Sequence, residues 1–152
     1  MKIPKFISLI FLCISLLKAS GAQGLNNALI VVVKMDSEIS HLSQKQVMSL
    51  FLGRAKFLPT GGKAKPLDFP TDSITRADFY RALTGKNIAD IDAYWARLKY
   101  SGRASPPQSF ESGEKIIEMV SRLDDAIAYL PEQFEGQLSE KGLKSVLTVR
   151  IN

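Results

Sequence analysis

The sequence predicts an α/β protein with a mixed β-sheet flanked by helices, because strand-like apolar runs alternate with amphipathic helical segments. The clearest strand is ALIVVVK at 28–34, a continuous β-branched run typical of a strand covered on both faces. The clearest helix starts after Ser43, where Ser43 and Gln46 form a capping-box pattern before an apolar stripe that ends at Gly53. Alternating apolar residues over 145–151 predict a closing strand.

The middle of the chain continues this alternation of strands and helices. The expected elements are a turn at 61–62, a strand over 64–69, helices over 73–83, 88–100 and 112–123, and a strand over 126–130. Asn87 and Ser112 are the expected helix caps, and Ser105-Pro106-Pro107 predicts an extended loop. The helical spacing of Tyr94, Trp95, Leu98 and Tyr100 indicates core residues rather than a binding platform.

Residues 1–22 have the pattern of a cleaved signal peptide. A basic start precedes an apolar run at 6–17, and the small residues Ser20-Gly21-Ala22 follow it. The run is shorter than the roughly 20 residues that a spanning helix needs, so we expect no membrane insertion of the mature chain. Cys13 lies inside the run after the bulky Leu12, which argues against lipid attachment there. We therefore expect residues 23–152 to form a single exported domain.

The charge of the expected mature chain is nearly balanced. Cleavage removes Lys2, Lys5 and Lys18, which lowers Lys plus Arg from 20 to 17 against 15 Asp plus Glu. Since the remaining charges are interspersed along the sequence, nucleic acid and anionic membranes are poor candidate partners. Cleavage also removes Cys13, the only cysteine, so that neither a disulfide nor thiol chemistry is expected.

The residues that usually carry enzyme chemistry are sparse. His41 is the only histidine, which excludes a cluster of histidine ligands or a pair of catalytic histidines. The acidic pairs at 90 and 92 and at 124–125 lack the spacing of a calcium loop. No catalytic triad, cysteine-histidine pair or nucleotide-binding loop is present. We therefore expect no enzymatic activity, no cofactor and no metal.

The strongest candidate site is Thr71-Asp72-Ser73-Ile74-Thr75-Arg76, at the expected start of a helix. Backbone amides and hydroxyl groups at a helix N-terminus can bind an anion, helped by the helix dipole. An arginine such as Arg76, Arg97 or Arg103 could add positive charge. The same residues also fit a simpler interpretation, in which Asp72 or Ser73 caps the helix, Thr75 lies in its first turn and Arg76 is solvated.

Three segments carry a family resemblance: FLG at 51–53, FYRALTGK…AYWARLKYSGRASPP at 79–107, and DDAIAYLP at 124–131. Through them the sequence resembles the small substrate-binding proteins related to the phosphate-binding component of ABC transporters, in the type II periplasmic-binding-protein superfamily. The resemblance implies a periplasmic location and a periplasmic-binding-protein-like lobe. It also implies a solute-binding role for uptake or sensing, with phosphate or another small oxyanion held by Asp72, Ser73, Thr75, Arg76 and Arg103.

The candidate site departs from the family pattern, in which an Arg, an Asp and a Ser-Gly-Thr wrap the oxyanion. Ser73 and Thr75 match, but Ile74 replaces the glycine and Phe69 stands at the position of the arginine. These changes hinder backbone access and remove a bidentate partner. About 130 residues also supply little more than one lobe. The alternative is therefore a degenerate binding-protein fold that acts as a non-transport interaction module with an envelope protein partner.

Overall fold

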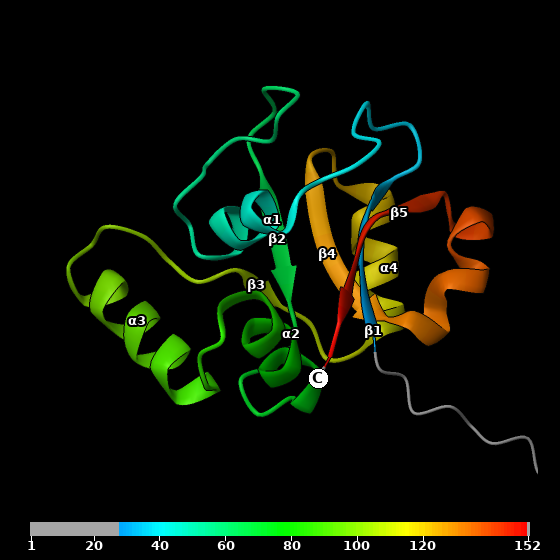
Figure 1. Ribbon diagram of the computed structural model, residues 1–152. Helices are drawn as coiled ribbons and strands as arrows, with labels where there is room; N and C mark the ends of the chain where they lie inside the picture. Colours follow the sequence, from blue (N-terminus) through cyan, green and yellow to red (C-terminus); the bar gives the residue numbers. More distant parts are fainter. Residues whose placement is uncertain (1–27, 152) are drawn as a thin grey trace, which may run out of the picture.

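The computed structural model describes residues 28–151, which form a five-stranded mixed sheet with helices packed against it (Figure 1). The strands are β1 (Ala28–Lys34), β2 (Lys65–Asp68), β3 (Gln108–Ser109), β4 (Ala126–Pro131) and β5 (Leu143–Arg150). The helices are α1 (Gln44–Phe51), α2 (Ile74–Thr84), α3 (Ile88–Tyr100) and α4 (Gly113–Arg122), with short 3-10 helices η1 (Glu132–Gln137) and η2 (Ser139–Lys141). The predicted signal peptide, residues 1–22, lies outside the described residues.

The strand order is β3-β2-β4-β1-β5, with both parallel and antiparallel pairs. β1 runs antiparallel to β4 and to β5, so that Ile30 lies opposite Leu130 on one side and Thr148 on the other. β2 runs parallel to β4 and to β3. The predicted α/β class with a mixed sheet is therefore confirmed.

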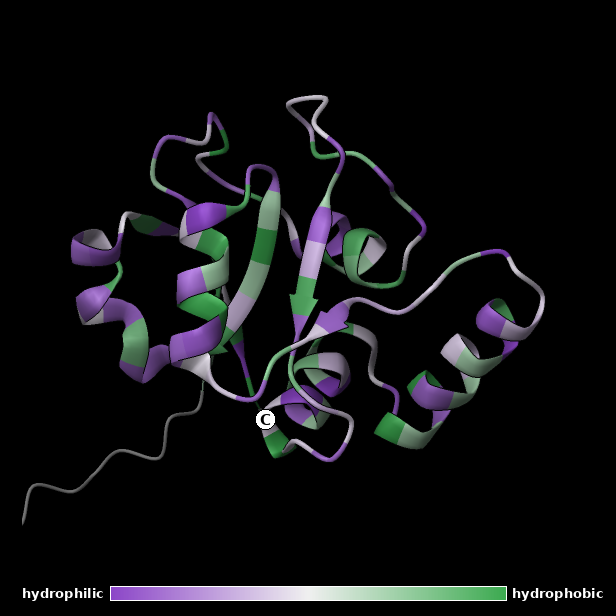
Figure 2. Cartoon of the chain, turned by 180° about the vertical axis from the view of Figure 1, so that it is seen from behind, coloured by the Kyte–Doolittle hydropathy of each residue, from purple (hydrophilic) through white to green (hydrophobic). Residues whose placement is uncertain are grey.

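Helices cover both faces of the sheet, which explains the continuous apolar strands. Figure 1 shows α4 on one side of β4 and β1, with α1 and α2 on the other. Every residue from Ala126 to Leu130 in β4 is buried, as two-sided cover requires. Polar and apolar residues alternate along α4 in Figure 2, because its inner positions, among them Ile116 and Val120, are buried. Among residues 28–151, no helix is long and apolar enough to cross a bilayer.

A cluster of buried aromatic rings fixes α1 and α2 against β4. The ring of Phe79 stacks on that of Tyr129, with centroids 3.6 Å apart and planes 6° apart. Phe51 meets both rings edge-on, at centroid distances of 4.9 Å and 5.6 Å. Such pairs contribute about 0.5–1.5 kcal/mol each beyond the burial of their area. The end of α1 and the middle of α2 are thus held at fixed positions over the strands.

The predicted helix caps are present. The hydroxyl of Ser43 accepts from the amide of Gln46, whose side chain accepts from the Ser43 amide in return, and this completes the capping box. Ser73, Asn87 and Ser112 accept in the same way from the third residue of α2, α3 and α4. Local side-chain chemistry therefore sets where these helices begin.

The structure differs from the prediction in several details, among them the two unpredicted 3-10 helices η1 and η2. β5 begins at Leu143 rather than 145, because Gly142 ends η2 in the left-handed region at φ 71° and the chain becomes extended directly afterwards. β3 was not expected, since a two-residue strand has no periodicity to read. Trp95 is buried and Tyr94 is packed against the core as predicted, but Tyr100 is 97% exposed because it ends α3 beyond the packed face.

Candidate functional site

The candidate anion site lies where β2 ends and α2 begins. The Ser73 hydroxyl accepts from the Arg76 amide at 3.4 Å, and the Ser73 amide donates to the Pro70 carbonyl at 3.0 Å. The capping role considered for Ser73 is therefore present. Asp72 is exposed and Thr75 is half-buried beside it. Ile74 is 78% exposed, so that this helix end faces water.

A buried carboxylate, Asp68, lies beneath this helix end and is 3% exposed. Its Oδ1 accepts from the Tyr129 hydroxyl and, at 2.8 Å, from the Phe69 amide. Its Oδ2 accepts from the Tyr80 hydroxyl at 2.9 Å and from Arg76 Nε at 3.2 Å. Four donors fill the capacity of the carboxylate, so that its charge is compensated within the fold.

Arg76 is only 4% exposed, so the interpretation in which it is solvated is wrong. Its Nε pairs with Asp68, and its Nη1 lies 2.9 Å from Asp92 Oδ1 on α3, an ion pair without the angles of a hydrogen bond. The guanidinium carbon also lies 5.2 Å from the centre of the Tyr80 ring. Burial follows because Asp68 enters the core at the end of β2 and needs a cation there. Two carboxylates therefore hold the charge of Arg76.

The ionisation of this cluster follows from burial and from Asp68. Burial raises the pKa of Asp68, and its hydrogen bonds from Tyr129 and Tyr80 and the charge of Arg76 oppose that rise. Burial, followed by the nearby Asp68 charge, raises the pKa values of Tyr80 and Tyr129 well above 10.0. Burial disfavours the Arg76 charge, yet Asp68 and Asp92 leave the pKa of Arg76 raised. Both phenols therefore stay protonated at neutral pH, and the cluster is structural.

The groups at the start of α2 that remain for an anion are mainly backbone amides. The early amides of a helix, here those of Ile74 and Thr75, have no intrahelical partner. The hydroxyls of Ser73, which only accepts in its capping bond, and of Thr75 add two further donors, whereas the exposed Asp72 carboxylate next to Ser73 repels anions. Because Arg76 is already paired with Asp68, this helix end offers hydrogen bonds with little positive charge.

Arg103 lies apart from the other candidate residues. Asp72, Ser73, Thr75 and Arg76 follow the carboxyl end of β2, but Arg103 shares a cavity with Lys65 at the amino end of that strand. The structure therefore brings together four of the five predicted residues and separates the fifth. Sequence reasoning missed the Asp68 cluster, although a lone carboxylate beside Leu67 and Phe69 was a usable signal, since a buried charge must be paired.

Solved structures of phosphate-transport proteins share this fold. PstS from Borrelia burgdorferi has a TM-score of 0.60 and 14% identity, over 80% of this chain and 50% of that one. An ABC-type phosphate transport receptor from Vibrio cholerae has a TM-score of 0.59 and 14% identity, over 80% and 47%. This chain thus spans about half the length of these structures, and its periplasmic-binding-protein-like fold is confirmed. No protein-family model and no curated protein matches the sequence.

Proposed function

We propose that the chain is a periplasmic, non-enzymatic solute-binding protein built from one lobe, which binds a small oxyanion such as phosphate at the start of α2. The observation that carries this proposal is the position of Ser73 and Thr75. They follow the carboxyl end of β2, and ligands of open α/β sheets bind at the carboxyl ends of parallel strands. The shared fold of the phosphate-transport proteins supports a solute-binding role.

The groups available at this site imply weak binding. The ligands would be the amides of Ile74 and Thr75 and the hydroxyls of Ser73 and Thr75, in contact with water. At about 1–2 kcal/mol for each of these four hydrogen bonds, their sum reaches at most about 8 kcal/mol before the entropic cost of association is subtracted. A micromolar dissociation constant requires about 8 kcal/mol. We therefore expect phosphate affinity weaker than micromolar.

A second candidate function is that of a non-transport interaction module that contacts an envelope protein. The specific observation in its favour is that Asp68 and Asp92 already occupy the guanidinium of Arg76. The exposed Ile74 side chain at the same helix end also suits a protein contact better than an anion. Under this proposal the fold is retained while the ligand position of transport proteins is no longer used.

Calorimetric titration of periplasm-purified protein with phosphate, sulfate and a neutral sugar separates the two candidates. A saturable heat with phosphate would support the oxyanion site if Ser73→Ala and Thr75→Ala each reduce the free energy of binding by about 1–2 kcal/mol. Thr60→Ala, at an exposed turn residue, is the matched control and should leave the titration unchanged. Absence of heat at millimolar phosphate would exclude the oxyanion site and leave the interaction module.

A further inference from the structure

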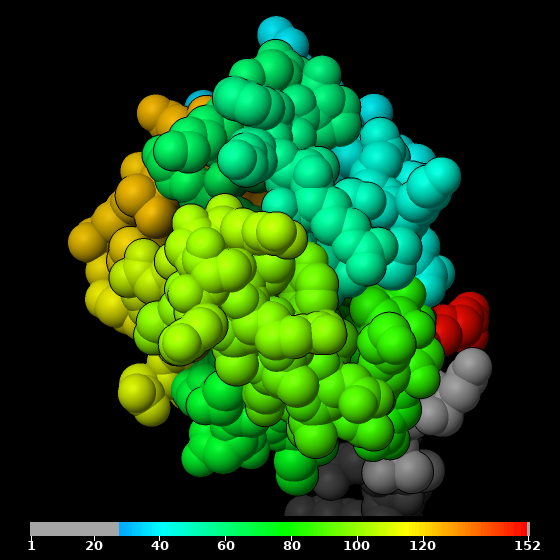
Figure 3. All heavy atoms as spheres, turned by 90° about the vertical axis from the view of Figure 1, so that its left-hand side faces the viewer, coloured from blue at the N-terminus to red at the C-terminus, as the bar shows by residue number. Residues whose placement is uncertain are grey.

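A groove lies on the face formed by the connection between α1 and β2 and by the loop after α3. Figure 3 shows these two segments meeting on one side of the molecule. The groove encloses about 550 Å³, and its walls are mostly apolar. Its wall residues include Leu50, Pro66, Leu67, Ala104 and Pro107. We call it the basic groove, because Lys56, Lys63, Lys65 and Arg103 also line it.

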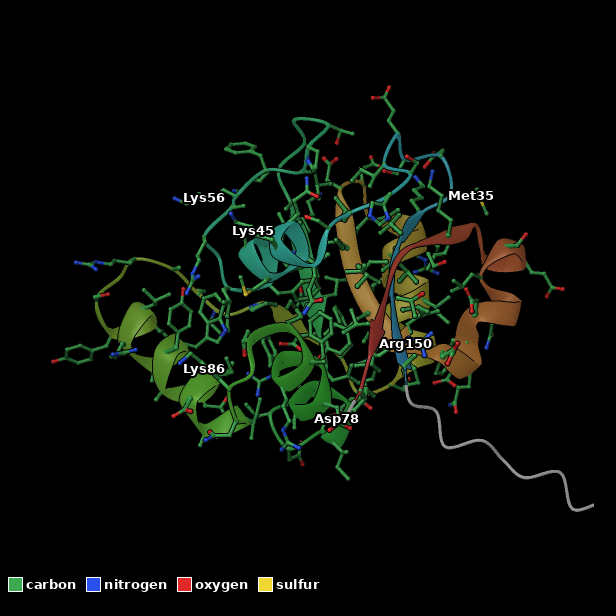
Figure 4. All side chains as sticks on the ribbon, in the orientation of Figure 1. Met35, Lys45, Lys56, Asp78, Lys86 and Arg150 are labelled. Carbon is green, nitrogen blue, oxygen red and sulfur yellow. The ribbon has the colours of Figure 1, made fainter. Side chains whose placement is uncertain are left out.

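The cations of the basic groove are largely unpaired, and no carboxylate lines it. Lys65 donates to the Asp124 carbonyl at 3.0 Å, but the side chains of Lys56, Lys63 and Arg103 have no hydrogen bond or ion pair within residues 28–151. Figure 4 shows Lys56 extending outward on the side where the loop after α3 lies. Positive charge is therefore available at the rim of a groove with apolar walls.

Two segments depart from the otherwise interspersed charges of the chain. Residues 43–65 contain five Lys or Arg and no Asp or Glu. Residues 111–141 contain eight Asp or Glu and three Lys or Arg. The near-balanced total hides a basic segment, and that segment forms one wall of the groove. An anionic ligand is the partner that this segregation favours.

The only tryptophan, Trp95, lines the groove and is 5% exposed. Gly53 lies against it in the left-handed region at φ 66°, where an added Cβ would come within 2.9 Å of the ring. The Trp95 Nε1 has no hydrogen bond of good geometry to a described residue, although it acts on the Tyr80 hydroxyl enough to oppose slightly the rise that burial causes in the pKa of that group, so that packing is the main contact that holds the ring. A ligand in the groove would therefore rest near a fixed aromatic surface whose fluorescence reports binding.

We propose that the basic groove binds an organic carboxylate with an apolar body. The walls would contact the apolar body, and Lys56, Lys63 and Arg103 would pair with the carboxylate, for which a guanidinium is the best geometric match. The volume lies within the range of about 300–1,000 Å³ that is usual for small-molecule sites. Inorganic phosphate would leave the apolar walls without a partner. The groove adjoins the amino end of β2, so this proposal does not depend on oxyanion binding at Ser73 and Thr75.

The test is a titration of the full protein with octanoate, followed by the fluorescence of Trp95 and by calorimetry. We expect a saturable change with octanoate, a dissociation constant at least about tenfold weaker for octan-1-ol, and weakening by added salt, because the carboxylate pairs with exposed cations. Arg103→Gln and the double variant Lys56→Gln/Lys63→Gln should each weaken octanoate binding by about two- to fivefold. Lys141→Gln is the matched control, since Lys141 is exposed and lies outside the groove.

Three results would overturn the proposal: no saturable response to octanoate, equal binding of octanol, or equal loss in Lys141→Gln and Arg103→Gln. All of these variants change exposed side chains, so that their folding can be verified by their denaturation midpoints. Phosphate titrated in parallel reports on the start of α2, and Arg103→Gln should leave that titration unchanged. Failure at one site is therefore distinguishable from failure at the other.

Discussion

Asp68 and Arg76 illustrate how one buried charge determines the role of another. A buried ion pair adds little stability compared with well-packed apolar residues, but removal of one partner leaves the other charge buried and uncompensated. Asp68 is 3% and Arg76 is 4% exposed, so neither can reach water without local unfolding. Arg76, which the sequence suggested as a ligand-binding arginine, is therefore needed to balance the buried charge of Asp68.

Arg76→Met should destabilise the fold by about 3–5 kcal/mol, because it leaves the Asp68 carboxylate buried without its cation. Urea unfolding followed by circular dichroism measures this loss. Arg81→Met, at an exposed position of the same helix, is the control and should change stability by less than about 0.5 kcal/mol. A similar small effect for both variants would show that the ion pair is dispensable.

The raised pKa values of Tyr80 and Tyr129 predict loss of stability at alkaline pH. In the unfolded chain a tyrosine ionises at about pH 10, whereas burial and Asp68 keep both phenols protonated in the fold. Their stabilisation is fully present below about pH 10 and declines as the pH rises from there toward the raised pKa values. Tyrosinate absorbance from these two residues should appear only together with unfolding. In Tyr80→Phe this late absorbance should be smaller; an unchanged amplitude would contradict the assignment.

At the scale of whole elements, most of the secondary structure could be predicted because its signals are local. Ser43 and Gln46 define the start of α1, and the apolar run at 28–34 defines β1. Packing over long sequence distances could not be predicted. Tyr129 and Asp68 lie 61 positions apart and meet only because β2 and β4 are neighbours, which no local pattern states. The same holds for the basic groove, whose walls come from separate segments.

Within α3 the helical spacing of apolar residues separates buried from exposed positions. Substitution of the buried Trp95 tests this assignment. Trp95→Ala should destabilise by about 3–5 kcal/mol, because it leaves a cavity next to Gly53. Thermal or urea unfolding measures the change. Tyr100→Ala, at the 97% exposed end of the same helix, should stay within about 0.5 kcal/mol of the parent. Equal midpoints for the two variants would place Trp95 on the surface.

The start of α2 provides a gain-of-function prediction. Ile74→Gly should strengthen phosphate binding, because it uncovers the helix amides without disturbing the core. Titration calorimetry of the variant against the parent measures the gain, and Ile74→Ala is the control that keeps a Cβ. Phe69→Arg is a poor companion, since Phe69 is 7% exposed and its ring lies 5.5 Å from that of Tyr129. Weaker binding in Ile74→Gly would mean that Ile74 shapes the site.

For the molecule as a whole, the sequence predicts export and removal of residues 1–22. We expect protein purified from the periplasm to begin at or near Gln23, since Ser20-Gly21-Ala22 supplies the small residues that a signal peptidase recognises. N-terminal sequencing of that fraction is the measurement, with the cytoplasmic fraction of a signal-peptidase-inhibited culture as the comparison. Intact Met1 on periplasmic protein would refute cleavage.

The order of the strands has a consequence for how such a chain matures. β1 comes first along the described chain, yet its two neighbours, β4 and β5, are the last strands to be synthesised. Val31 in β1 therefore cannot pair with Tyr129 and Leu147 until β4 and β5 have been synthesised. Contacts between residues so distant in sequence slow folding. The central strand of the sheet therefore gains both of its partners only after the segments at 126–131 and 143–150 have been made, so that the sheet is closed by pairing between opposite ends of the described chain.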